Sequence, residues 1–187
     1  MGLLKWYDNR YTFRRRKRYV NYTTVGKLNL ETIHPSRGGV ILYTILNGEL
    51  YFALGLDSRT HELTDFAGGI SYKRDGNVIS GALREYQEET LNIFSPLSYD
   101  NITHCPVIYD SNNLTIFIRV DVNPDDVSRV FGQRYEAYSK LNKGVPEVCS
   151  ITWLNIKEFR YCVDSYGYMY ERLRAFLSRA NHLLYFL

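Results

Sequence analysis

The sequence of 187 residues is 45% apolar and 15% aromatic, which is enough for one domain with a packed core. It contains no apolar run of about 18 residues, which argues against a membrane span, and residues 1–10 lack the extended apolar segment of a secretory signal. The three cysteines are odd in number and lack Cys-x-x-Cys spacing, so we expect free thiols and an intracellular, cytoplasmic protein.

Charge is distributed unevenly, although the net charge is only +3. Residues 1–20 carry a local charge of +6, while the rest of the chain has 16 basic and 19 acidic residues. We therefore divide the chain into a basic N-terminal extension, 1–20, and one domain, 21–187. Five consecutive basic residues in the extension would suit the phosphates of a nucleic acid or a nuclear address: Arg14, Arg15, Arg16, Lys17 and Arg18. A solvated arm without any partner fits this composition equally well.

Hydrophobic patterning predicts strands interleaved with helices along the chain. Expected strands cover 25–31, 39–45, 50–56, 104–109, 114–122 and 148–154, and expected helices cover 77–91, 125–142 and 166–184. Asn47-Gly48 separates the second and third of these strands and is a strong hairpin signal. Strands with helices on both faces predict an α/β fold, an α/β/α sandwich with a mixed sheet.

One helical segment carries an unusual concentration of acid. Glu85, Glu88 and Glu89 lie within five residues, directly after Arg84. At about 100° per residue the three carboxylates share one face of a helix, where like charges at these spacings are destabilising. A hard divalent cation with oxygen ligands, Mg²⁺ or Mn²⁺, would offset that repulsion, whereas a solvated acidic face is the simpler alternative.

A Gly68-Gly69 pair precedes this helix and follows two strand-like segments. Glycines allow a ligand to approach the backbone closely, so an exposed carbonyl of Gly68 could add a neutral oxygen to the carboxylates. Because the acidic segment follows a Gly-Gly turn, and this turn follows two strand-like segments, we favour a metal site over a solvated surface.

The stretch from Gly69 to Glu89 resembles the Nudix box, a glycine and a loop followed by an Arg-Glu-x-x-Glu-Glu helix. The likeness extends over about residues 24 to 180, including a late strand that ends near Trp153. Three departures are visible. The loop is one residue longer than the family pattern, Gly76 stands where a loop glutamate is expected, and Leu91 replaces a glycine after the acidic pair.

The resemblance implies a hydrolase that cleaves a phosphoanhydride bond in a nucleoside diphosphate linked to another moiety. By position, Glu88 and Glu89 would ligate Mg²⁺ or Mn²⁺, with the Gly68 carbonyl as a further ligand. Glu85 would complete the metal set or orient the attacking water. The resemblance further implies that Arg84 forms a supporting salt bridge, with Gly69 and Asp75 in the same supporting role.

A later acid often supplies the catalytic base in that family. Glu147 is our first choice because it opens the expected strand at 148–154, and Glu136 is the second; for each, an ordinary surface glutamate is the competing interpretation. Substrate choice is expected to reside in loops 57–65 and 124–146.

Three functions remain open at this point. The first is a pyrophosphatase acting on a nucleotide-type small molecule, and the second is an mRNA-decapping enzyme that uses the basic arm on capped RNA. The third, from another class, is a catalytically silent module that binds nucleotides or RNA. No partner in a membrane is expected, and the sequence leaves the oligomeric state open.

Overall fold

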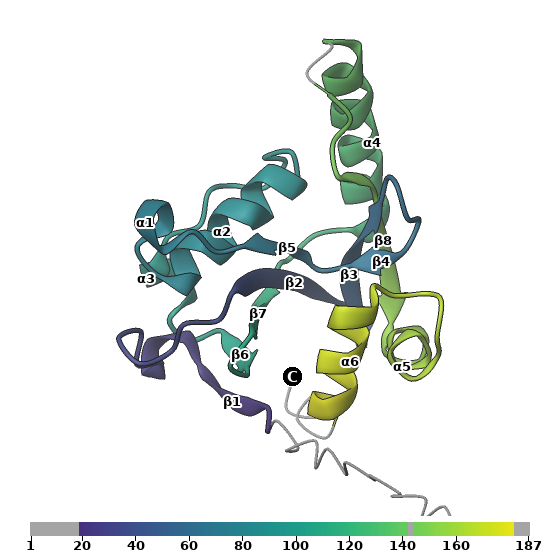
Figure 1. Cartoon of the computed structure of the whole chain (residues 1–187). Coiled ribbons are helices and arrows are strands. Elements are labelled where there is room, and N and C mark those ends of the chain that lie inside the picture. The colour runs from purple at the N-terminus through teal and green to yellow at the C-terminus, as the bar shows by residue number, and fades with distance from the viewer. Residues whose placement is uncertain (1–18, 142–143, 182–187) are drawn as a thin grey trace, which may run out of the picture.

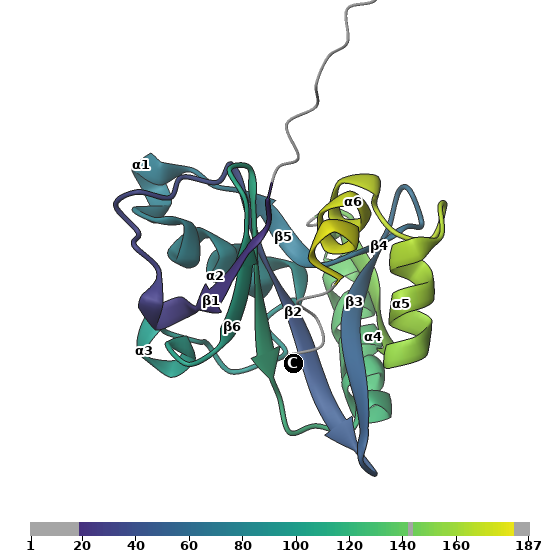
Figure 2. The same ribbon diagram turned by 90° about the horizontal axis from the view of Figure 1, so that it is seen from below.

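The computed structural model describes residues 19–141 and 144–181. In this part of the chain a mixed sheet separates two layers of helices, which confirms the predicted α/β/α sandwich (Figures 1 and 2). The basic residues 14–18 lie outside the described residues. None of the described helices has the length and apolar character needed to cross a membrane.

The described residues form one eight-stranded sheet around a long central strand, β2. The order is β1-β6-β7-β2-β3-β4, with β5 also paired to β2 and β8 to β3. Strand β2 runs parallel to β7 and antiparallel to β3 and β5. The strands are β1 (Asn21–Thr24), β2 (Arg37–Leu46), β3 (Glu49–Asp57), β4 (Leu63–Thr64), β5 (Phe66–Gly69), β6 (Pro106–Tyr109), β7 (Asn113–Arg119) and β8 (Val148–Asn155).

The predicted hairpin between β2 and β3 is confirmed. Asn47 and Gly48 have φ angles of 53° and 81°, and the flanking residues Leu46 and Glu49 are paired directly. Two consecutive residues with positive φ match the right-handed twist of the strands, and Asn-Gly adopts that conformation readily. This turn fixes the register of the two strands.

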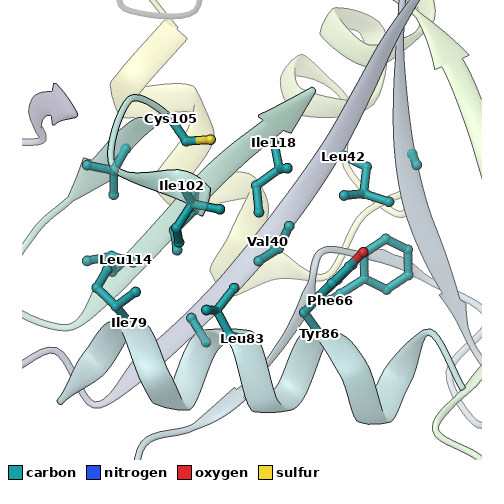
Figure 3. Packing of buried hydrophobic residues seen from close by; sticks show 14 of the residues in the cluster. Val40, Leu42, Phe66, Ile79, Leu83, Tyr86, Ile102, Cys105, Leu114 and Ile118 are labelled. Carbon is teal, nitrogen blue, oxygen red and sulfur yellow. The ribbon is translucent and has the colours of Figure 1, made fainter. Parts of the chain in front are cut away.

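Apolar side chains alternate between the two faces of the sheet. In β2, Val40 and Leu42 join one buried cluster, while Ile41 between them joins the other. Figure 3 shows the first cluster, in which Leu83 and Tyr86 of one helix point at β2. This period of two along a strand buries both faces of the sheet and leaves room for a helix layer on each side.

The helices divide between these two clusters. Helix α2 (Val78–Glu89) and the first half of α4 (Pro124–Lys140) contribute to the first cluster. Helices α5 (Ile156–Asp164) and α6 (Glu171–Ala180) cover the opposite face (Figure 2). The remaining elements are the 3₁₀ turn η1 (Val25–Lys27) and the single-turn helices α1 (Tyr72–Asp75) and α3 (Tyr99–Ile102).

The prediction at the N-terminal end of the domain was wrong. The expected strand at 25–31 is instead the turn η1 and a loop, and β1 precedes it. Val25 and Gly26 donate backbone hydrogen bonds to Cys105 and Thr103, which turns the chain away from the sheet edge. Val25 is fully buried in this turn. Its apolar side chain therefore gave a misleading strand signal in the sequence.

The predicted closing helix at 166–184 was also partly wrong. Helix α6 starts only at Glu171, because Gly167 has a φ of 88° and interrupts the helix, and the chain from 182 onward lies outside the described residues. A separate helix, α5, was not predicted. It begins at a capping box in which Asn155 accepts the backbone N–H of Glu158, and the Glu158 carboxylate accepts the N–H of Asn155.

Candidate active site

The acidic helix α2 follows the single-turn helix α1. Helix α1 lies within the loop that is one residue longer than the family pattern. Gly76 ends α1 with a φ of 76°, a conformation that a glutamate would adopt only with strain. Asn77 follows as the N-cap, and its side chain accepts the backbone N–H of Ser80 at 2.9 Å. The departure of this loop from the family pattern is therefore accommodated by a defined turn.

The apolar face of α2 determines where its acids point. Ile79, Leu83 and Tyr86 are buried against the sheet (Figure 3). The carboxylates of Glu85 and Glu88 are less deeply buried than that of Glu89: the Glu88 side chain is 58% exposed, and the Glu85 side chain, which packs against β5, is 15% exposed. We call these two the outer acids. Glu89 is turned further inward and retains only 9% of its exposed surface.

Arg84 joins the loop, strand β5 and the outer acids. Its guanidinium donates to Asp75 at 2.9 and 3.2 Å and to the Gly69 carbonyl at 3.2 Å. It also forms ion pairs with Glu85 at 2.7 Å and Glu88 at 3.0 Å. The hydrogen bonds from Arg84 lower the pKa of Asp75 to about 2, and the same partners raise the pKa of Arg84.

Gly68 lies directly beneath the Glu85 carboxylate. A Cβ atom at this position would collide with the carboxyl group of Glu85, so only glycine allows that carboxylate its present place. At Gly69 the same atom would meet nothing within 4 Å. The two neighbouring glycines thus have different roles, one in close packing against an acid and one at an open position.

Glu89 is the buried acid of the site. Its carboxylate accepts the backbone N–H of Ala67 in β5 at 2.8 Å. Burial raises the pKa of Glu89 to about 9; the Ala67 hydrogen bond and Arg37 oppose this shift, while the charges of Asp65 and Glu147 add to it. A buried carboxyl whose charged form is so disfavoured is characteristic of a functional site.

Sequence reasoning left a second buried charge centre beside Glu89 without a role. Arg37, at the start of β2, donates to both carboxylate oxygens of Asp65, at 2.6 and 3.1 Å. Thr115 in β7 also donates to Asp65, at 3.1 Å. Asp65 is fully buried, and 8% of Arg37 is exposed. Arg37 at the start of an otherwise apolar strand could have indicated this ion pair in the sequence, because a buried arginine needs an acidic partner.

Two cavities meet at Glu89 and Glu147. The larger, of about 550 Å³, lies between the end of α2 and α4 and is also lined by Glu85, Glu88 and Tyr138. The smaller, of about 300 Å³, extends along residues 57–64 to Arg37 and Tyr170. Parts of both loops that we expected to select substrate therefore face these cavities.

The two candidate bases occupy different places. Glu147 lines both cavities, and its carboxylate lies 4.0 Å from the guanidinium of Arg59. Glu136 lies on α4, where it pairs with Lys140 at 3.9 Å, and it lines neither cavity. Of the two, the structure brings only Glu147 next to Glu89.

Leu91, the third departure from the family pattern, directly follows Thr90, the C-cap of helix α2. Its N–H donates to Glu88, and the N–H of Asn92 donates to Gln87, which is the Schellman arrangement. Leu91 has a φ of 52°, in the region that glycine adopts most easily. The backbone conformation therefore matches a glycine position, although this chain places a buried leucine there.

The donor set suits a hard cation. Glu85, Glu88, Glu89 and a backbone carbonyl offer only oxygen atoms, and the burial of Glu89 makes its negative charge unfavourable without a nearby positive one. Within residues 19–141 and 144–181 no group of three acidic, histidine or cysteine side chains already converges as a metal site. Glu85 and Glu88 are held by Arg84 in this arrangement, so each would exchange an arginine contact for the cation.

No protein-family model and no curated protein matches the chain. Among solved structures, it is similar to an Ap4A hydrolase from C. elegans in a binary complex, with 16% identity over 81% of this chain and 98% of the other and a TM-score of 0.47. It is also similar to the NUDIX domain of Shewanella oneidensis NrtR complexed with ADP ribose, with 12% identity over 86% and 96% and a TM-score of 0.44. At these identities and scores the likenesses assign neither a family nor an activity to this chain.

Proposed function

We propose that the protein is a metal-dependent hydrolase that cleaves a phosphoanhydride bond in a nucleoside diphosphate linked to another moiety. The observation that carries this proposal is the buried Glu89 carboxyl at the junction of two cavities. Glu85 and Glu88 lie within one turn of helix from it, so oxygen donors are concentrated where the cavities meet.

Glu85, Glu88, Glu89 and the carbonyl of Gly68 would hold Mg²⁺ or Mn²⁺. When bound, such a cation neutralises the charge that develops on phosphate oxygens during hydrolysis. Because burial places the pKa of Glu89 near 9, the carboxyl retains its proton at neutral pH without a cation and would release it on binding one.

Glu147 would act as the general base for the attacking water. Its side chain is 68% exposed, so the carboxylate can return the proton to solvent after each cycle. Arg84 would position Glu85 and Glu88, because it links both acids to Asp75 and to the Gly69 carbonyl. Glu85 would orient the water if it does not serve as a ligand.

The test is hydrolysis by the purified full chain with Mg²⁺ or Mn²⁺ of four substrate types: capped RNA, dinucleoside polyphosphates, ADP-ribose and nucleoside triphosphates. We expect at least one to be cleaved at a phosphoanhydride bond, and cleavage to stop with EDTA. Activity that persists in EDTA, or that survives in Glu88→Gln and Glu89→Gln, would refute the metal assignment.

A silent binding module is the second candidate, and the arrangement around Arg84 supports it. An arginine that already neutralises Glu85 and Glu88 lets the outer acids persist without a cation. This candidate predicts calorimetric binding of a nucleotide without hydrolysis of any substrate in the screen. Nucleotide affinity would then be the same in Glu89→Gln and in the wild type.

A further inference from the structure

The α4 side of the larger cavity is lined by Arg134 and Tyr138. The two residues are four positions apart, so their side chains leave the same face of the helix, about 6 Å apart along its axis. The first half of α4 packs on the core through Val127 and Phe131, and the helix then projects beyond the sheet (Figure 1). One rigid element therefore carries both side chains past the acids of α2.

Arg134 is available to a ligand. It is the only basic residue that lines the larger cavity within the described chain, and it forms no ion pair with a described residue. By contrast, Arg129 on the same helix pairs with Asp126 at 2.8 Å. A guanidinium presents N–H donors in a planar arrangement that matches the oxygens of a phosphate. Arg134 can therefore donate to a phosphate without giving up an ion pair.

Each cavity has one described tyrosine in its wall, and the two rings differ in their contacts. Tyr170, in the smaller cavity, has its ring centre 5.7 Å from the guanidinium of Arg37. Tyr138, in the larger cavity, is half-buried against the first apolar cluster, and its ring stacks on no other aromatic ring of the described chain. Leu91 and Pro146 line the same cavity. A planar base beside Tyr138 would therefore find a ring to stack on and apolar neighbours.

The charges around the larger cavity favour one direction for a bound nucleotide. Glu85 and Glu88 on α2 repel phosphate oxygens unless a cation lies between them, whereas Arg134 attracts them. Arg134 also lies one turn nearer than Tyr138 to the half of α4 that packs on the core. A phosphate bound by Arg134 would therefore lie on the core side of the cavity, and a base on Tyr138 towards the projecting end of the helix.

We propose that Arg134 and Tyr138 recognise the nucleoside half of the substrate, which binds in the larger cavity with its base on Tyr138 and its phosphate on Arg134. The group linked to the nucleoside diphosphate then occupies the smaller cavity, on the other side of Glu89 and Glu147. This division of the substrate rests on the proposed function, whereas the binding of a nucleotide by Arg134 and Tyr138 does not.

The experiment measures binding to the full chain by isothermal titration calorimetry with two probes, adenosine 5′-monophosphate and ribose 5-phosphate. Both carry a phosphate, only the first carries a base, and neither contains a phosphoanhydride bond that could be cleaved. Each titration is made with Mg²⁺ and again in EDTA. We expect the wild type to bind adenosine 5′-monophosphate about tenfold more tightly than ribose 5-phosphate, because one base stacked on an aromatic ring contributes about this factor.

The variants separate the base from the phosphate. Tyr138→Ala should weaken binding of adenosine 5′-monophosphate about tenfold and leave that of ribose 5-phosphate unchanged, because it removes only the stacking contact. Tyr138→Phe keeps the ring and should bind both probes within about twofold of the wild type. Arg134→Gln should weaken binding of both probes about tenfold, because a charged hydrogen bond to the phosphate is lost.

Arg129→Gln is the matched control for Arg134, because it lies on the same helix and lines neither cavity. It should bind both probes as the wild type does, and circular dichroism melting should show that all variants are folded. Affinity of Tyr138→Ala for adenosine 5′-monophosphate within about twofold of the wild type would overturn the proposal, as would equal losses for both probes or a wild type that binds neither. A greater loss in Tyr170→Ala than in Tyr138→Ala would place the base in the smaller cavity and overturn it too.

The failures of the two proposals are distinguishable. Binding that depends on the base and on Tyr138, in a protein that hydrolyses nothing, would refute the enzyme and leave the nucleotide site in place. Metal-dependent hydrolysis whose KM is the same in the wild type, Tyr138→Ala and Arg134→Gln would keep the enzyme and refute the site.

Discussion

Asp65 and Glu89 are two buried carboxyl groups beside the same strand, β5, and they differ in their hydrogen-bond and ion-pair partners. Asp65 is fully buried and receives both donors of Arg37 and the hydroxyl of Thr115. Glu89 is 9% exposed and receives one backbone N–H from Ala67, without any ion pair in the described part of the chain. The charge of Asp65 is compensated by an ion pair, whereas the partners of Glu89 compensate a charge so poorly that its pKa is raised to about 9.

This difference separates structural from functional charge. A buried acid with a full set of partners stabilises the arrangement that holds it, and removing either partner is costly. A buried acid without a cation is unfavourable in its charged form, as the raised pKa of Glu89 shows. Proteins retain such groups mainly where function requires them, so the comparison identifies Glu89 as the centre of the candidate site.

Glu89→Gln is the strongest test of the difference between Glu89 and Asp65. We expect a loss of metal-dependent hydrolysis of about 10³-fold or more, about 4 kcal/mol, because a ligand of the cation is removed. The free energy of unfolding without metal should stay the same or rise at neutral pH, since glutamine, unlike Glu89, needs no proton taken up on folding. Steady-state kinetics and urea unfolding measure the two quantities, and Glu31→Gln, at an exposed site, is the matched control.

The free energy of unfolding should depend on pH differently in the wild type and in Glu89→Gln. The folded pKa of Glu89 is about 9, above its ordinary value of 4.5, so the folded protein holds the proton more tightly. Its contribution to stability is complete below pH 4.5 and is lost as the pH rises toward 9. Glu89→Gln should lack this decline, and an identical decline in both proteins would contradict the role of Glu89.

Asp65→Asn is expected to act mainly on stability. It leaves Arg37 buried without its counter-charge, which typically lowers the free energy of unfolding by about 3 to 5 kcal/mol. Urea unfolding measures this loss. Replacing both partners, as Arg37→Met/Asp65→Leu, should restore much of the stability. If the free energy of unfolding of Asp65→Asn stays within about 1 kcal/mol of the wild type, the contrast between Asp65 and Glu89 is wrong.

Asp75→Asn extends the comparison to the outer acids. It removes a charged hydrogen bond to Arg84, so we expect a loss of about 1.5 to 3 kcal/mol in the free energy of unfolding at neutral pH. The folded pKa of Asp75 is about 2, below its ordinary value of 3.8. Its contribution is therefore present above pH 3.8 and is lost as the pH falls toward 2. Acid unfolding followed by circular dichroism should show that component in the wild type alone.

Gly68→Ala and Gly69→Ala form the matched pair with the smallest expected effect. An added methyl group at Gly68 meets the Glu85 carboxylate, whereas one at Gly69 meets open space. We expect hydrolysis to fall about tenfold in the first variant, because displacement of a positioned group slows the reaction. Activity should be nearly unchanged in the second, and equal losses in both would show that the position of Glu85 is unimportant.

Local patterns in the sequence predicted most of the fold. The Asn47-Gly48 hairpin, the acidic helix at 77–91 and the strand at 114–122 all followed from spacing and turn chemistry. Helix α5 was missed because its nine residues are short for a periodic signal. The turn at Val25 was missed because its hydrogen bonds come from residues about 80 positions away.

The candidate site was predicted only in part. The carboxylates on α2 could be identified because they share one segment, and Glu147 could be named by its place before a strand. The contacts that distinguish Glu89 from its neighbours come from Ala67 and from a cavity wall built by distant segments. The partnership of Arg37 with Asp65 likewise joins residues 28 positions apart, so no local pattern reveals it.

The central position of β2 has a consequence for how the protein is made. Its neighbours come from residues 49–57, 66–69 and 113–119, and the last of these pairs in parallel. During synthesis the β2–β3 hairpin can form early, but the strand carrying Thr115 reaches Asp65 only after about sixty percent of the chain has been made. Such long-range parallel pairing slows folding. Shortened chains that end before β7 should therefore expose Arg37 and Asp65 without a complete sheet, and become clients for chaperones or proteases.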